Sequence, residues 1–192
     1  MEITYQEEVF MREKAMKNLL YWSLASMVIF FGGFCSYYLV MQGNGSWLSF
    51  QLPSTFFFST SVIVFSSATM LWAQKSIQKG QNRNATLGLF FTLILGFLFC
   101  ATQFIAWSDL HSHGIVFSGK SSNISGSILY VITFLHFLHI IAGIIALLVT
   151  TFKVSRNRYS ERSHLGISLC AIFWHFLDVL WVILFLLLYF NR

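Results

Sequence analysis

The chain has 192 residues, of which 56% are hydrophobic, 18% aromatic and only 10% charged, and its formal net charge is +5. This composition is that of an integral membrane protein and leaves no room for a soluble domain. Apolar runs of membrane-spanning length predict helices, since barrel strands need only about ten alternating residues. We expect an all-α, polytopic five-helix bundle that forms a single membrane domain over 1–192. The predicted transmembrane helices are roughly 18–41, 53–73, 86–107, 125–152 and 164–190.

The basic residues follow a topological pattern. All twelve Lys and Arg lie outside the apolar runs: ten occupy the N-terminus and the second and fourth connections, whereas Lys120 and Arg192 lie on the other side. Cytoplasmic segments carry the excess of Lys and Arg in membrane proteins, so we predict a cytoplasmic N-terminus and a periplasmic C-terminus. Because topology accounts for the basic charge, no binding of nucleic acid is predicted.

The first two runs differ in the residues they offer for packing. Gly32 and Gly33, with Ser26 and Ser36, form a stripe of small residues in the first run that is suited to close contact with another helix. We therefore expect this helix to pack tightly against a neighbour. The second run is rich in Ser and Thr, whose hydroxyls can bond to their own helix or across to another.

The candidate metal ligands do not form a complete set. Asp109, His111 and His113 in the third connection could chelate a metal, but no further ligand is spaced to complete a shell. The cysteines have neither CxxC spacing nor a zinc-like Cys/His interval, so we interpret them as small core residues. No metal site is therefore predicted. The cysteines are Cys35, Cys100 and Cys170.

The last two runs carry polar residues near the middle of the membrane. His136 and His139 lie three residues apart in the fourth run, as do His175 and Asp178 in the fifth. A carboxylate at mid-depth costs about 2.5 to 3.5 kcal/mol even on mild insertion scales, so Asp178 is expected to face protein. The short fourth connection predicts antiparallel neighbours, and we hypothesise a buried polar network of these four residues. On the same face of the fifth helix lie Trp174 and Trp181.

Three roles for these intramembrane residues remain open. Haem ligation requires imidazoles at two facing positions, and two His three apart on one helix cannot sandwich a single haem. A proton relay requires a continuous path to both surfaces, and no other apolar run supplies an acid or base. The favoured interpretation is a satisfied polar cluster that determines how two helices pack.

At these residues the chain resembles a known family. The stretch WHFLDVLWVILFLLLYF resembles the closing helix of subunit III of haem-copper oxidases, and FLHFLHIIAG resembles the paired-histidine stretch of the preceding helix. The similarity continues over nearly the whole chain, through LASMVIFFGGF, LPSTFFFSTSVIVFSSATMLWA and LGLFFTLILGFLFCATQFIAW. The number of predicted helices is similar to that of the shorter bacterial form of the family.

The resemblance implies an accessory subunit of an aa3-type terminal oxidase in the bacterial inner membrane, without catalytic residues or redox centres of its own. Haem a and copper are expected in partner subunits. The implied partners are subunit I, as the main docking partner, subunit II, membrane phospholipids and, as a further candidate, a larger respiratory supercomplex. The family also implies support of sustained proton uptake. Arg156 and His164 match its lipid-headgroup positions, and a basic cytoplasmic loop attracts lipid phosphates.

Departures from the family pattern limit what can be carried over. Met27 and Ala106 stand where many members have Glu, so no role of those acids is expected, while Gln103 and Trp107 follow a bacterial pattern. The subunit III of a quinol oxidase or a nitric oxide reductase accessory subunit remain alternatives. A haem-binding protein or an independent carrier is an alternative of another class. One Pro and an odd number of predicted helices disfavour the carrier.

Overall fold

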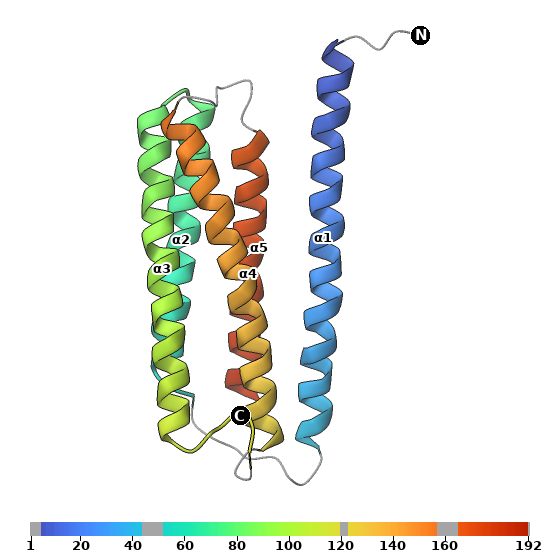
Figure 1. The fold of residues 1–192 in the computed structure, drawn as a ribbon, viewed down its shortest axis with the longest axis vertical. Helices are drawn as coiled ribbons and strands as arrows, with labels where there is room; N and C mark the ends of the chain where they lie inside the picture. Colours follow the sequence, from blue (N-terminus) through green and yellow to red (C-terminus); the bar gives the residue numbers. More distant parts are fainter. Residues whose placement is uncertain (1–4, 44–51, 120–122, 157–164, 192) are drawn as a thin grey trace.

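The structure, a computed structural model, describes residues 5–43, 52–119, 123–156 and 165–191 (Figure 1). Within these residues the chain forms five α-helices and no strand, and each helix is long and apolar enough to cross a membrane. The predicted all-α, polytopic architecture is therefore confirmed. The helices are α1 (Tyr5–Gln42), α2 (Thr55–Gln78), α3 (Asn82–Ser112), α4 (Ile124–Ser155) and α5 (Leu165–Phe190).

Several helices continue beyond the apolar runs that predicted them. The 38 residues of α1 extend over about 57 Å, whereas a hydrocarbon layer is about 30 Å thick. Polar residues add turns at the membrane surface, where hydropathy no longer marks the helix. At the start of α4, Asn123 supplies an N-cap, because its Oδ1 accepts a hydrogen bond from the Gly126 amide at 2.8 Å.

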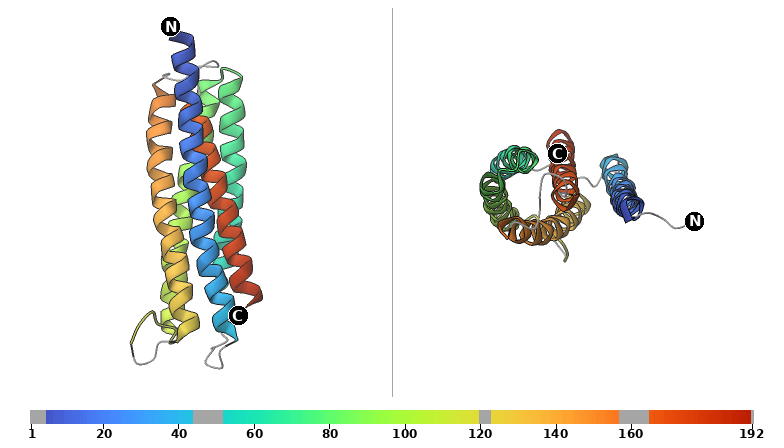
Figure 2. Two further views of the ribbon diagram at one scale, coloured as in Figure 1. Left: turned by 90° about the vertical axis from the view of Figure 1, so that its right-hand side faces the viewer. Right: turned by 90° about the horizontal axis from the view of Figure 1, so that it is seen from above.

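Four helices form the body of the molecule. The packed pairs are α2–α3, α3–α4, α4–α5 and α2–α5, so these helices enclose a common interior. Seen end on, α1 lies outside this group and packs only along α4 and α5 (Figure 2). Gly80 adopts a φ of 70° in the turn between α2 and α3. Beyond this turn, Gly88 lies so close to Ala73 that an added Cβ would be 2.8 Å from the alanine Cβ.

The small-residue stripe of α1 does not make the expected close contact within the described chain. A Cβ added at Gly32 or Gly33 would meet no atom within 4 Å. Leu24, Phe31 and Tyr38 instead form the buried face of α1, at intervals of seven residues. Gly32 lines an open groove between α1 and α5 without touching α5. Close packing at Gly32 and Gly33 thus remains a prediction for a molecule outside this chain.

The antiparallel order brings the N-terminal end of α1, the turn between α2 and α3 and the C-terminal end of α4 to one end of the molecule (Figure 1). Every Lys and Arg among the described residues belongs to these segments. The described part of the opposite end therefore carries no Lys or Arg. These basic residues are Arg12, Lys14, Lys17, Lys75, Lys79, Arg83, Lys153 and Arg156.

Candidate functional site

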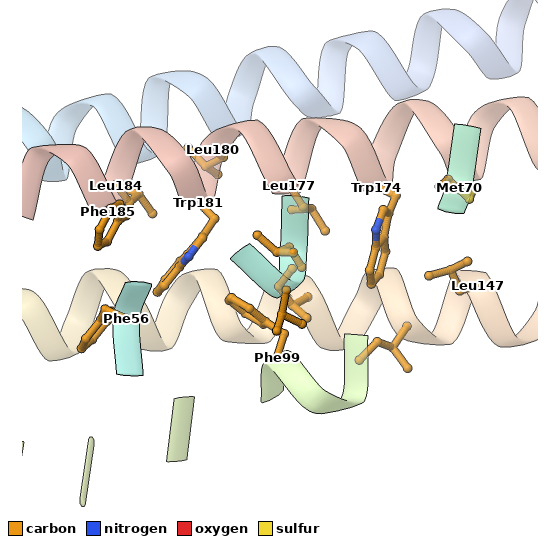
Figure 3. Close-up of a cluster of buried hydrophobic side chains, with 14 of the residues drawn as sticks. Phe56, Met70, Phe99, Leu147, Trp174, Leu177, Leu180, Trp181, Leu184 and Phe185 are labelled. Atoms are coloured by element: carbon orange, nitrogen blue, oxygen red, sulfur yellow. The ribbon is translucent and has the colours of Figure 1, made fainter. Parts of the chain in front are cut away.

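The inward face of α5 is attached to α2 by its two indole groups. Trp174 and Trp181 are completely buried and project from α5 into the bundle interior (Figure 3). Trp174 donates from Nε1 to Ser66 Oγ at 3.0 Å, and Trp181 donates to Thr60 Oγ1 at 3.1 Å. Because both acceptors are hydroxyls of α2, these two bonds set the rotation of α5 against that helix.

Glycines on two other helices make room for one of these indoles. A Cβ added at Gly96 on α3 would lie 2.9 Å from the Trp174 ring, and one at Gly143 on α4 would lie 3.2 Å from it. The contact between α4 and α5 at this level is thus formed by a ring against a glycine, with Leu177 also 3.0 Å from the added Gly143 Cβ. This contact leaves the interface between α4 and α5 apolar at the level of Trp174.

Ser67 joins two of the predicted polar residues between the tryptophans. Its hydroxyl donates to Asp178 Oδ2 and lies 3.0 Å from His175 Nδ1. Asp178 is only 3% exposed, so the carboxyl group is held inside protein at mid-helix. Asp178 Oδ1 and His175 Nε2 have no hydrogen-bonding partner among the described residues. We call Ser67, His175 and Asp178 the serine junction.

The two histidines of α4 lie outside the serine junction. His136 is completely buried, and its ring stacks on Trp181 with centroids 5.1 Å apart. His139 is partly buried, its Nδ1 is 2.7 Å from the Leu135 carbonyl oxygen, and its ring is 5.4 Å from Phe31 of α1.

The structure joins two of the four residues of the expected network by hydrogen bonds. Hydrogen bonds through Ser67 connect His175 with Asp178 across α2 and α5, while His136 reaches α5 by ring stacking on Trp181. The physical reason is that α5 turns its polar side chains toward the hydroxyls of α2. The abundance of Ser and Thr in α2 was the sequence signal for this partner, but it did not single out Ser67.

Chemically, the serine junction can hold two helices together and keep a carboxyl group in the membrane interior. Within the described residues, no group of three or more His, Cys, Asp or Glu is placed to hold a metal ion. At the exposed end of α3, His113 Nδ1 lies 3.5 Å from Asp109 Oδ1 within a single turn. The cysteines, which are free thiols on three different helices, are Cys35, Cys100 and Cys170.

The basic end of the molecule contains one of the two predicted lipid contacts. Arg156 follows the last turn of α4, is exposed, and places its guanidinium carbon 4.5 Å from the centroid of the Phe152 ring. His164, the second candidate, lies outside the described residues. A groove of about 370 Å³ runs between α1, α4 and α5 at this end, and its lining includes Leu20, Lys153 and Phe173.

Comparison with known proteins places this chain in a family. The family model described as cytochrome c oxidase subunit III matches residues 18–192. Over 148 residues the chain is 30% identical to cytochrome c oxidase subunit 3 of Drosophila yakuba, covering 77% of this chain and 53% of the relative. Over 140 residues it is 31% identical to that of Spodoptera frugiperda, covering 73% and 89%.

A third relative is the cytochrome c oxidase subunit 3 of Pylaiella littoralis, which is 35% identical over 133 residues, or 69% of this chain and 47% of the relative. The chain spans about half the length of the first curated relatives it matches. The family model nevertheless covers all of α2 to α5 and most of α1. This multi-pass membrane protein therefore belongs to the cytochrome c oxidase subunit III family.

Proposed function

We propose that this chain is the accessory subunit III of a bacterial aa3-type haem-copper terminal oxidase, located in the inner membrane. It supports the stability, lipid binding and sustained proton uptake of a complex that reduces O2 and pumps protons. The observation that carries the proposal is the serine junction, in a chain of this family. Its polar groups at mid-depth hold α5 to α2. Holding helices together is the role of a scaffold and not of a reaction centre.

The proposed partners follow from this role. Subunit I, which carries haem a and copper, is the main docking partner, and subunit II and a larger respiratory supercomplex are further partners. The chain itself contributes no catalytic residue. Because the electron donor is bound by other subunits, a quinol oxidase would be recognised from its companion chains and not from this one.

Phospholipid binding is proposed at the basic end. Arg156 and His164 contact the headgroup phosphate, and the groove between α1, α4 and α5 takes an acyl chain. Lys153 at this groove adds a positive charge beside its apolar lining. Basic side chains at the cytoplasmic surface attract anionic lipid by about 1 kcal/mol each.

The test is purification through an affinity tag on this chain in a gentle detergent, followed by mass spectrometry and a visible spectrum. We expect a large polytopic subunit to co-elute, together with the absorption bands of haem a. A colourless chain eluting alone would contradict the proposal and favour an independent carrier. A Soret band stoichiometric with the isolated chain would instead favour a haem-binding protein.

A further inference from the structure

Two enclosed polar side chains lie outside the serine junction. Gln103 on α3 is 1% exposed, and His136 on α4 is 0% exposed. Among the described residues, neither amide atom of Gln103 and neither ring nitrogen of His136 has a hydrogen-bonding partner. Since roughly 90% or more of buried polar groups in proteins are hydrogen bonded, these atoms require a partner of another kind.

The register of α3 and α4 places the two side chains at the same depth. Trp107 on α3 donates to Thr133 on α4 at 3.1 Å, and one turn further along the two helices the rings of Phe104 and Phe137 are 5.2 Å apart. The helices are antiparallel, so these two contacts define which residues are level with one another. By this register Gln103 and His136 differ in depth by one to two residues, or about 1.5 to 3 Å.

The two side chains also enter the same part of the interior. Phe99 precedes Gln103 by one turn on the buried face of α3, and its ring centroid lies 6.2 Å from that of His136. Packed helices lie about 8 to 10 Å apart. Polar groups that enter one layer from two adjacent helices are therefore within reach of a single small molecule between them.

We propose that Gln103 and His136 bind an ordered water molecule in the interior of the helix bundle. The amide offers two donors and an acceptor, and a neutral imidazole offers one of each, so a water with two donors and two acceptors suits both side chains. A larger ligand does not suit the layer, because the rings of Phe31, Phe99 and Trp181 surround His136.

The bound water has a structural consequence. It connects α3 to α4 at a level where His136 also stacks on Trp181 of α5. It also fixes the orientation of the imidazole ring, because a ring whose nitrogen is hydrogen bonded to the water can no longer rotate freely. The water thus joins α3 to α4, and the stacking of His136 on Trp181 links this pair to α5.

The direct test is a structure of the assembled complex, determined at a resolution that shows ordered waters. We expect a density peak within hydrogen-bonding distance of both the Gln103 amide and a ring nitrogen of His136. A direct contact between the two side chains, or a layer filled by apolar groups with no peak, overturns the proposal.

The sign of a stability change provides a second test. Replacing a buried polar group that has a partner lowers stability, whereas replacing an unpaired one by an apolar group of similar shape does not. We therefore expect Gln103→Leu to lower the midpoint temperature of thermal unfolding of the purified chain. Thr133→Val is the calibrating control, since it removes the acceptor of Trp107 Nε1. A raised midpoint for Gln103→Leu contradicts the bound water. This outcome does not depend on whether the chain is an oxidase subunit.

Coupling between the two side chains completes this test. If one water bridges them, the lowering of the midpoint in Gln103→Leu with His136→Phe is smaller than the sum of the two single effects, because each single change already breaks the bridge. Additive effects overturn the proposal. Should either variant fail to fold, the density of the unmodified complex still decides.

Discussion

Ser67 illustrates how one hydroxyl can contact two larger polar groups in the membrane interior. A serine hydroxyl carries one proton and two lone pairs. The hydroxyl donates that proton to Asp178 Oδ2, and its oxygen lies 3.0 Å from His175 Nδ1. One hydroxyl of α2 thus contacts both polar side chains of α5. Loss of Ser67 would leave both side chains of α5 without their link to α2.

Ser67→Ala is expected to destabilise the chain by about 1–3 kcal/mol, because it leaves the Asp178 carboxyl group buried without its donor. Thermal unfolding of the purified protein in detergent measures this. The matched control is Ser61→Ala on the same helix, where the exposed hydroxyl bonds only to the Phe57 carbonyl at 3.0 Å. We expect the control to change stability by about 0.5 kcal/mol or less. Equal effects of the two changes would show that the serine junction contributes no stability.

Asp178→Asn tests whether the carboxyl group serves packing or proton transfer. The amide has nearly the same shape but no charge and no titrating proton. We expect O2 reduction by the purified oxidase to persist, while retention of this subunit or of bound lipid falls. Quantitative mass spectrometry of the complex and proton-pumping assays of the reconstituted enzyme measure the two effects. Full subunit and lipid content with loss of pumping would favour the proton relay.

Gly88 and Gly33 illustrate opposite surroundings of a glycine in an apolar run. Gly88 allows close contact between α2 and α3, since an added Cβ would meet the Ala73 Cα and backbone nitrogen at 3.0 Å. Gly33 on α1 faces open space. A glycine in an apolar run therefore predicts a close contact only when the neighbouring helix is known.

Gly88→Val is expected to force α2 and α3 apart and to destabilise the protein by about 1–3 kcal/mol, because backbone atoms of Ala73 cannot move aside as a flexible side chain can. The control is Gly33→Ala, which gains up to about 1 kcal/mol of helix propensity without meeting a neighbour. Thermal unfolding compares both variants with the unmodified chain. A neutral Gly88→Val would contradict the close approach of these two helices.

At the scale of the molecule, the basic side chains of the described residues gather at one end. All Lys and Arg of the described residues lie at the end that contains the turn between α2 and α3. An excess of Lys and Arg marks the cytoplasmic side of membrane proteins. The described N- and C-terminal helix ends lie at opposite ends of the molecule (Figure 1), so the two termini are expected on opposite sides of the membrane.

Reporter fusions in a bacterial host test this orientation. Alkaline phosphatase is active only outside the cytoplasm, whereas green fluorescent protein exported through the general secretory route does not fluoresce. We expect fluorescence from an N-terminal fusion and phosphatase activity from a C-terminal fusion. The reciprocal pair serves as the control and is expected to be inactive. The opposite result would invert the proposed topology and place Arg156 on the periplasmic side.

The sequence by itself determined the class of the protein, the approximate positions of its helices and its family. Apolar runs and a rise of about 1.5 Å per residue are local properties, so they predict a spanning helix without knowledge of its neighbours. The spacing of His175 and Asp178 likewise placed both on one helix face. Helix ends were predicted less well, because polar turns at the membrane surface carry no hydropathy signal, as at the start of α1.

Only the tertiary structure decided which helix each face meets. The polar face of α5 meets Ser67 on α2, and a Cβ added at Gly32 or Gly33 of α1 would meet no atom within 4 Å. Helix rotation depends on side chains from several helices at once. Trp174, for example, requires glycines on α3 and α4 as well as a hydroxyl on α2. A periodic pattern identifies one face of one helix, and the neighbour of that face is a property of the assembled bundle.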